Sequence, residues 1–271
     1  MQFSLYIVST PIGNLKDITV RGKELLQCVD YVLCEDTRVS EKLLKSVGVK
    51  ARFIVYNDYN SKAITPKIVK KMKVDCKKYA LISDAGTPLI SDPGYELVNA
   101  CIDHGVKYTV IPGSCAAIAA LTLSGLPSDR FLFAGFVDHR KFKELSKVNA
   151  TLIFYESPRR VLKTLKVMKD YFSTRTIAVV REITKIHEEL RRNDVNSLIA
   201  YFESNAPKGE FVIIVSPPGQ DSVVDKLYEL KPLIDELVGK ISVRDLSEIL
   251  SRYTKMSKNA IYKFLSNYQG R

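Results

Sequence analysis

The feature that most constrains this chain is a pair of glycine-bearing loops that follow two successive predicted strands. Apolar runs at 79–82 and 107–111 predict the strands, and helical patterns at 95–101 and 115–124 follow the loops. An open α/β sheet binds its ligand where parallel strands end. Small residues at that edge let a ligand approach the backbone, so that amide groups can hold it. The two loops therefore predict a ligand site, although any α/β domain also uses glycine and proline simply to turn between strand and helix.

The known phosphate-binding fingerprints are missing from both loops. No G-x-G-x-x-G follows a strand, and no G-x-x-x-x-G-K-[ST] occurs, so a Rossmann dinucleotide site and a P-loop are disfavoured. The first loop instead carries two aspartates among small residues: Asp84, Gly86, Thr87, Asp92 and Gly94. We therefore expect a ligand that needs no phosphate cradle.

Size and charge narrow the class of protein. At 271 residues the chain predicts two domains and a smaller third piece, and 46% hydrophobic residues suffice for sizeable cores. The net charge of +11 favours a polyanionic partner, with nucleic acid ahead of an anionic membrane. A generally lysine-rich composition is the alternative explanation.

The cysteines and the amino terminus indicate a compartment. Five cysteines without a C-x-x-C pair, and three scattered histidines, predict neither a disulfide framework nor a metal site. The first ten residues lack a basic region before the apolar run, and no apolar stretch is long enough to span a membrane. We expect a soluble cytoplasmic protein without membrane contact.

The order of predicted elements indicates an α/β fold with two α/β domains and a helical tail. Strands at 5–8 and 31–34, with Thr19 as the cap of the helix between them, begin a strand–helix alternation over residues 1–126 that predicts a mostly parallel sheet. A second α/β domain is predicted over 127–218 after the break at Gly125–Ser128. Its expected strands are 131–136, 151–155, 176–180, a segment near 186–190, and 211–215. Ser157-Pro158 is expected to open one helix and Asp194 to cap another.

The tail, residues 219–271, differs in composition. Helices are predicted over 221–238, 242–253 and 257–268, with Ser242 and Ser257 as the caps of the last two, which resemble a helix-turn-helix. Between Gly239 and Arg271 there are seven Lys and Arg against two Asp and Glu. The second helix of the pair would present four side chains to RNA: Lys258, Asn259, Tyr262 and Lys263. A helical hairpin that only packs or dimerises is the alternative.

Seven collinear sequence blocks over residues 4–216 carry a family resemblance. They are Thr10–Leu15, Glu35–Arg38, Ser83–Gly94, Pro112-Gly113, Phe154–Ser157, Arg181–Thr184 and Lys208–Glu210. The set closely resembles the ribosomal RNA small subunit methyltransferase I family, of the tetrapyrrole-methylase-like (class III) S-adenosylmethionine methyltransferases. The tail resembles the carboxyl-terminal helix-turn-helix of that family. Ser114 stands where the family usually has proline, which affects only the local shape of the loop.

The resemblance implies a homodimer of two-domain subunits with S-adenosyl-L-methionine in the cleft between the domains. It implies methyl transfer to the ribose 2′-oxygen of a decoding-centre cytidine in small-subunit (16S) rRNA. The residues implied for cofactor binding are Pro11, Asp84, Ala85, Gly86, Thr87, Ile90, Cys115 and Ala116, with Tyr155, Glu156, Glu182 and Glu210 from the second domain. The absent phosphate fingerprints agree with a sulfonium cofactor, and the positive charge agrees with rRNA.

Methyl transfer to an alcohol requires alignment of the two reactants and removal of the hydroxyl proton. The candidates for this chemistry are Glu35, Asp36 and Arg38, with Asn14 and Asp58 nearby at strand ends. A structural ion pair and helix cap would explain the same residues. Cys115 is expected to be a small packing residue because no histidine is positioned to activate it.

Two other functions stay open on the sequence. One is a tetrapyrrole methyltransferase that acts on a precorrin or uroporphyrinogen. The other is a non-catalytic RNA-binding assembly factor that has kept the fold. Cofactor binding would separate the second from both enzymes, and the substrate that accepts the methyl group would separate the two enzymes.

Overall fold

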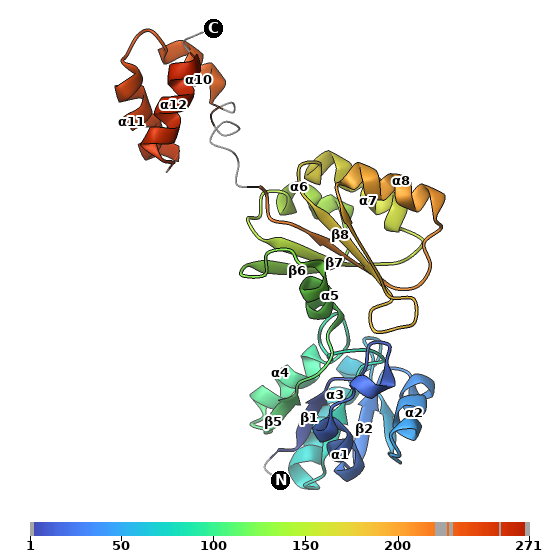
Figure 1. Ribbon diagram of the computed structural model, residues 1–271. Helices are drawn as coiled ribbons and strands as arrows, with labels where there is room; N and C mark the ends of the chain where they lie inside the picture. Colours follow the sequence, from blue (N-terminus) through green and yellow to red (C-terminus); the bar gives the residue numbers. More distant parts are fainter. Residues whose placement is uncertain (1–2, 220–226, 228–229, 255, 269–271) are drawn as a thin grey trace. The chain divides into compact units, whose positions relative to one another are not determined.

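The structure is a computed structural model and describes residues 3–219, 227, 230–254 and 256–268. The chain divides into two compact units, Met1–Pro217 and Pro218–Arg271. The first unit, which we call the two-sheet unit, contains two five-stranded sheets, and the described part of the second unit is helical (Figure 1).

The first sheet is entirely parallel, as the strand–helix alternation predicts. Its strand order is β3-β2-β4-β1-β5. The strands are β1 (Leu5–Val8), β2 (Tyr31–Cys34), β3 (Phe53–Val55), β4 (Tyr79–Leu81) and β5 (Tyr108–Ile111). The helices α1 (Val20–Cys28), α2 (Thr37–Ser46), α3 (Ser61–Val74) and α4 (Tyr95–Asp103) connect them. All five strands therefore point their carboxyl ends toward one edge.

Strand residues alternate between two cores because successive side chains of a strand point to opposite faces. Tyr6 and Val8 of β1 pack with Leu25 and Leu26 of α1. Leu5, at the start of the strand, packs instead in the core that α3 and α4 complete. Helices thus cover both faces of the sheet, and its inner strands β1, β2 and β4 are apolar, as expected for a buried parallel sheet.

The second sheet is mixed. Its order is β6-β7-β10-β8-β9, with β6 and β7 parallel and the other neighbours antiparallel. The strands are β6 (Phe131–Phe136), β7 (Thr151–Glu156), β8 (Ile177–Arg181), β9 (Glu189–Asn193) and β10 (Phe211–Val215). The helices of this half are α6 (Phe142–Leu145), α7 (Val161–Phe172) and α8 (Val195–Ser204). Side chains of all three helices share one core with one face of the sheet.

Helix α5 (Ala116–Ser124) joins the two halves. It follows β5 in the chain, yet Ala117, Ala120 and Leu121 pack on the second sheet, against Ile153 and Ile214 among others. Alanine side chains permit this close approach of helix to sheet. Both sheets belong to the same compact unit. The domain boundary predicted at residues 126/127 therefore stays a prediction.

Two predictions in the second half are wrong in detail. Ser157 does not cap α7: its carbonyl accepts the amides of Arg160 and Val161, so a turn precedes the helix, which begins at Val161. The strand expected near 186–190 begins at Glu189. The residues before it form a loop in which the Glu188 carboxylate accepts the amide of Thr184 at 2.7 Å. Asp194 caps α8 as predicted.

The second unit contains α10 (Lys231–Leu237), α11 (Val243–Thr254) and α12 (Lys258–Tyr268). Leu246 and Leu250 of α11 pack with Ile261 and Leu265 of α12, so the unit has a core of its own. Ser242 caps α11 as expected, because its Oγ accepts the amide of Asp245 at 3.1 Å. The helix predicted over 221–238 lies partly outside the described residues.

Within the described residues, no helix combines the length and the apolar character needed to cross a lipid bilayer.

Candidate active site

The loops after β1, β4 and β5 are tied together at the carboxyl edge of the first sheet. The Thr10 amide donates to the Gly86 carbonyl at 2.8 Å, and the Gly86 amide returns a bond to the Thr10 carbonyl at 3.1 Å. Thr87 Oγ1 donates to the Ser114 carbonyl at 2.9 Å, which joins the β4 and β5 loops. The three loops therefore form one floor rather than separate turns.

Gly86 shapes this floor through its missing side chain. Its amide and its carbonyl are both bonded to Thr10, and its predicted backbone contact with the cofactor stays a prediction. Its φ of +88° lies in the left-handed region, and an added Cβ would lie 3.2 Å from Ile12 Cγ2. Glycine is therefore required for close approach and conformation.

The rest of the β4 loop also carries backbone strain. Leu89 and Ser91 have φ values of 72° and 65°, and Gly94 has φ 138°. Non-glycine residues in this region cost of the order of 1–3 kcal/mol each, and such residues cluster at functional sites. The surrounding hydrogen bonds are what hold the loop in this shape.

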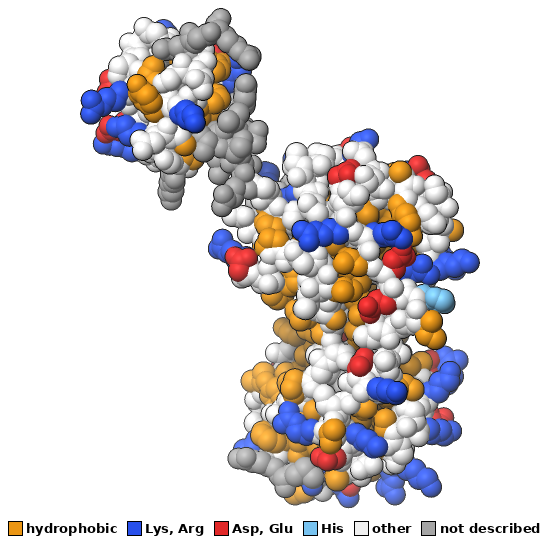
Figure 2. Space-filling model, in the orientation of Figure 1, with side chains coloured by type: hydrophobic (Ala, Val, Ile, Leu, Met, Phe, Trp, Pro, Cys, Tyr) orange, Lys and Arg blue, Asp and Glu red, His pale blue; other side chains and the backbone are white. Residues whose placement is uncertain are grey.

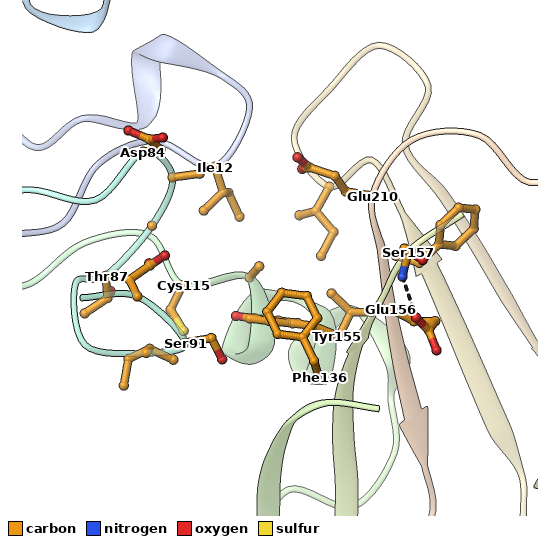
Figure 3. A pocket seen from close by; sticks show the side chains of 18 of the residues that line it. Ile12, Asp84, Thr87, Ser91, Cys115, Phe136, Tyr155, Glu156, Ser157 and Glu210 are labelled. Carbon is orange, nitrogen blue, oxygen red and sulfur yellow. Dashed lines mark hydrogen bonds between the residues drawn. The ribbon is translucent and has the colours of Figure 1, made fainter. Parts of the chain in front are cut away.

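A cavity of about 420 Å³ lies between this floor and the second sheet (Figure 3). A volume of this size suits a small-molecule ligand. Every residue predicted to bind the cofactor lines it except Pro11 and Glu182. The lining residues from that prediction are Asp84, Ala85, Gly86, Thr87, Ile90, Cys115, Ala116, Tyr155, Glu156 and Glu210.

Tyr155 forms an aromatic wall of the cavity. Its ring lies edge-on to Phe133 and Phe136, at centroid distances of 4.8 and 5.8 Å. Its hydroxyl accepts the amide of Ala117 at 3.2 Å, at the start of α5. Burial raises the pKa of Tyr155, so the phenol stays protonated. The neutral ring is fixed between the second sheet and α5.

Glu156 lines the cavity, but its carboxylate does not act on the open space. Its carboxylate points away from the open space, as Figure 3 shows, and its Oε1 accepts the Ser157 amide at 2.7 Å. Arg160 Nε donates to the same oxygen at 2.8 Å, and Thr164 Oγ1 donates to Oε2 at 2.6 Å. Because these partners satisfy the buried carboxylate, Glu156 anchors the turn before α7.

Glu182 also serves the frame of the site. Its Oε1 accepts the Glu210 amide at 2.9 Å and Lys185 Nζ at 3.0 Å. Burial alone would raise the pKa of Glu182, but these hydrogen bonds bring that pKa below its usual range. Gly209 makes room for this arrangement, since a Cβ there would lie 2.5 Å from Glu182 Cδ. Glu182 thus holds Glu210 at the cavity without lining it.

The charge of the lining is negative. Among the described residues that line the cavity, none is Lys, Arg or His, whereas Asp84 and Asp92 both face it. Burial, followed by the charges of Glu35 and Asp84, raises the pKa of Asp92 to about 6. Burial likewise raises the pKa of Asp84. Carboxylates without basic neighbours favour a cation with an apolar body and disfavour a polyphosphate.

The predicted catalytic residues lie beside the cavity and not in its lining. Asp36 is connected to it, because its amide donates to Asp84 Oδ1 at 3.4 Å. Asp36 caps α2 and binds Arg38 at 2.6 Å, and these hydrogen bonds lower its pKa to about 2. In the described part of the chain Glu35 has neither a hydrogen bond nor an ion pair. Desolvation and the Asp84 charge raise its pKa.

Several residues that line the cavity were not among the residues predicted to bind the cofactor. They are Ile12, Ser91, Asp92, Phe136, Ser157, Pro158, Ile183, Gly209, Phe211 and Val212. Six of them already lie inside the family blocks, and Pro158 and Phe211 directly follow a block, so the blocks marked the region but not each contact. No sequence signal distinguishes Phe136 from the other apolar residues of β6, because only the tertiary fold turns it toward the cavity.

The residues predicted to bind RNA lie on α12 of the second unit. Asn259, Tyr262 and Lys263 are exposed on the side opposite the buried Ile261. Lys258 is partly buried and its Nζ binds Glu248 Oε2 at 2.7 Å. Three of the four side chains are therefore free to meet a ligand, and the charge of the fourth is compensated.

A metal centre finds no support in the described residues, where no group of three or more His, Cys, Asp or Glu side chains is placed to hold an ion.

Comparison with known proteins agrees with this geometry. Residues 4–199 match the family model described as Tetrapyrrole (Corrin/Porphyrin) Methylases. A Mesorhizobium japonicum protein named Ribosomal RNA small subunit methyltransferase I is 42% identical over 270 residues, covering 97% of this chain and 91% of that protein. The chain belongs to the ribosomal RNA small subunit methyltransferase I family. Methyltransferases of this family use S-adenosyl-L-methionine.

Two further relatives extend the comparison. A Thermotoga maritima protein of the same name is 41% identical over 217 residues, which cover 78% of this chain and 97% of that protein. The crystal structure of uroporphyrin-III-C-methyltransferase from Thermus thermophilus has a TM-score of 0.57 and 20% identity, and the match covers 83% of this chain and 96% of that one. The latter likeness concerns the fold, and it confirms the predicted tetrapyrrole methylase architecture.

Proposed function

We propose that this protein transfers a methyl group from S-adenosyl-L-methionine to small-subunit rRNA, at the ribose 2′-oxygen of a decoding-centre cytidine. The observation that carries the proposal is the 42% identity over 97% of the chain to a protein named for rRNA methylation. The carboxylate-bearing, base-free cavity supports a sulfonium donor. The net charge of +11 supports a polyanionic substrate.

Some residues of the site hold the methyl donor, and another accepts the proton of the acceptor hydroxyl. When bound, S-adenosyl-L-methionine supplies a methyl group on a positively charged sulfur. Asp84 and Asp92 provide negative charge at the cavity, and Tyr155 provides an apolar wall. Glu35 is the best placed of the three catalytic candidates to accept the hydroxyl proton, because its carboxylate has no competing partner in the described residues and its pKa is raised.

Replacing Arg38 with alanine is expected to lower turnover about tenfold and to change S-adenosyl-L-methionine affinity less than twofold. The guanidinium is 88% exposed, is paired with Asp36 and lies outside the cavity lining, so it can orient RNA but not the cofactor. Asp36→Ala is expected to lower turnover as well and also to destabilise α2 by about 1 kcal/mol, since it removes the helix cap.

Steady-state methylation of ribosomal subunits, together with calorimetry, measures both effects. Arg21→Ala is the matched control, because it removes another exposed arginine from the same half of the chain. If Arg38→Ala methylates ribosomal subunits at the rate of the parent protein, Arg38 has no role in the reaction.

We further propose that the protein acts as a homodimer. Large apolar side chains are exposed on two helices and two edge strands of the two-sheet unit, which are α4, α5, β5 and β6. Examples are Tyr95 (73%), Val110 (46%) and Phe136 (59%), and Figure 2 shows apolar side chains gathered over these elements (Figure 2). A second copy of the chain would cover this face. A monomeric mass by light scattering at assay concentrations would contradict this proposal.

The deciding experiment is methyl transfer from radiolabelled S-adenosyl-L-methionine to unmethylated small ribosomal subunits or naked small-subunit rRNA. Label in rRNA, located at one cytidine 2′-oxygen by nuclease digestion, is the expected result. Label in a tetrapyrrole instead would favour the other enzyme class. RNA binding without cofactor binding in calorimetry would identify a non-catalytic assembly factor.

A further inference from the structure

A second concavity lies next to the cavity on the two-sheet unit. It measures about 530 Å³ and is formed by the turn after β6 and the start of α7. Its lining residues are Val137, Asp138, His139, Arg140, Arg160 and Lys163. We name it the β6–α7 groove.

The groove is the centre of a basic segment. Residues 138–169 contain nine Lys and Arg against three Asp and Glu. Two of the three acids are already compensated: Asp138 binds Arg140 Nε and Nη2, both at 2.9 Å, and buried Glu156 binds Arg160. Lys163 is exposed and has neither an ion pair nor a hydrogen bond in the described part of the chain. Arg140 and Arg160 are thus paired with carboxylates, and Lys163 carries the uncompensated positive charge of the groove.

The groove and the cavity adjoin each other along two chain segments. Phe136 lines the cavity and the next residue, Val137, lines the groove. Pro158 likewise lines the cavity, and Arg160 lines the groove two residues later. The groove and the cavity therefore lie on either side of the same two chain segments.

The basic side chains of the groove are held in place by the same carboxylate that anchors the cavity turn. Glu156, whose side chain is fully buried, binds Arg160 Nε and Thr164 Oγ1. Because Thr164 donates its only proton to Glu156, its oxygen must accept from His139 Nε2, which lies 2.9 Å away. Arg160 and His139 are thus oriented before any ligand arrives, which lowers the entropic cost of binding.

We propose that the β6–α7 groove binds the phosphodiester backbone of the substrate RNA next to the nucleotide that enters the cavity. This inference rests on the proposed function and assigns RNA contacts to the two-sheet unit in addition to α12. Arginine and lysine side chains are the usual partners of phosphate oxygens. The Thermotoga relative supports it, because the match covers 97% of that protein but 78% of this chain, so a shorter protein carries the same name.

The test is the double variant Arg140→Gln/Lys163→Glu, which changes the charge of the groove by three units and spares Arg160 and Glu156. The matched control is Lys70→Gln/Lys67→Glu on the exposed side of α3, with the same charge change on the first sheet. Binding of unmethylated small-subunit rRNA is measured by fluorescence anisotropy over a range of salt concentrations. Calorimetry with S-adenosyl-L-methionine and thermal unfolding show whether the cavity and the fold are intact.

The groove variant is expected to weaken RNA binding about tenfold or more. The slope of log affinity against log salt should become shallower by about 0.7 for each phosphate that the protein no longer neutralises. Cofactor affinity and the unfolding midpoint are expected to stay at parental values. RNA affinity within twofold of the parent would overturn the inference. Equal weakening by the α3 control would also overturn it, since net charge alone would then account for the weaker binding.

The same experiment separates this inference from the proposed function. If the parent protein methylates small subunits and the groove variant binds them equally well, only the groove assignment fails. If the parent protein does not methylate them, the proposed function fails whatever the groove binds.

Discussion

Replacing Gly86 with alanine is expected to raise the dissociation constant of S-adenosyl-L-methionine at least about tenfold, equivalent to about 1.4 kcal/mol. At φ +88° a side chain is strained, and the new Cβ would lie 3.2 Å from Ile12 Cγ2 and 3.6 Å from the Ser114 carbonyl. Relief of this close approach must move Ile12, which lines the cavity, or the bridge between Thr10 and Gly86. Either movement deforms the floor of the site.

Gly48→Ala is the matched control for this prediction. Gly48 has a similar φ of +72°, but an added Cβ there has no neighbour within 4 Å. Both variants should lose about 1 kcal/mol of folding free energy through backbone strain. Only Gly86→Ala should lose cofactor affinity in calorimetry. Equal cofactor affinities of the two variants would show that the β4 loop does not form the cofactor floor.

Replacing Asp92 with asparagine is expected to stabilise the ligand-free protein by about 1–2 kcal/mol at pH 7 while weakening cofactor binding several-fold. The pKa of Asp92 is raised from 3.8 to about 6, chiefly by burial. The folded state therefore holds a proton between pH 4 and 6 that the unfolded state has released. Stability of the parent falls as the pH rises through this window, and the cost stays in full above it. Asparagine carries no charge and avoids that cost.

Denaturant titrations of the ligand-free proteins from pH 4 to pH 8 measure this effect. The stabilisation should be absent near pH 4, where both side chains are neutral in the fold, and should reach its full value above pH 6. Asp129→Asn, which makes the same change at an exposed position, should show no such dependence. If the free energies of unfolding of Asp92→Asn and of the parent change with pH in the same way, the raised pKa of Asp92 in the folded protein is contradicted. The expected gain in stability with loss of binding is typical of carboxylates kept for function.

Much of the first sheet was predictable because its signals are local. The apolar runs 5–8 and 31–34 coincide with β1 and β2, and the Thr19 hydroxyl caps α1 by accepting the amide of Gly22. Buried parallel strands are short apolar runs, and helix caps are set by single side chains. The same signals failed at Ser157, whose Oγ accepts Arg160 Nε at 3.3 Å instead of a backbone amide of the helix.

The candidate site was predictable to a similar extent. The strand-end loops of the first sheet identified seven of the residues that line the cavity, since parallel strands deliver their loops to one edge of the sheet. The position of Glu182 could not be predicted, because its side chain fills the space beside Gly209, far away in the sequence. Nor could the direction of the Glu156 carboxylate, which depends on Thr164 and Arg160.

The sequence by itself determined the strands, the turns and the chemical types of residue that reach the ligand edge, because these depend on neighbours within a few positions along the chain. Only the tertiary structure decided that α5 packs on the second sheet, that Asp92 holds its proton to about pH 6, and that the β6–α7 groove adjoins the cavity. These properties depend on which distant surfaces meet and on how much water they exclude. Neither quantity is contained in the local pattern of residues.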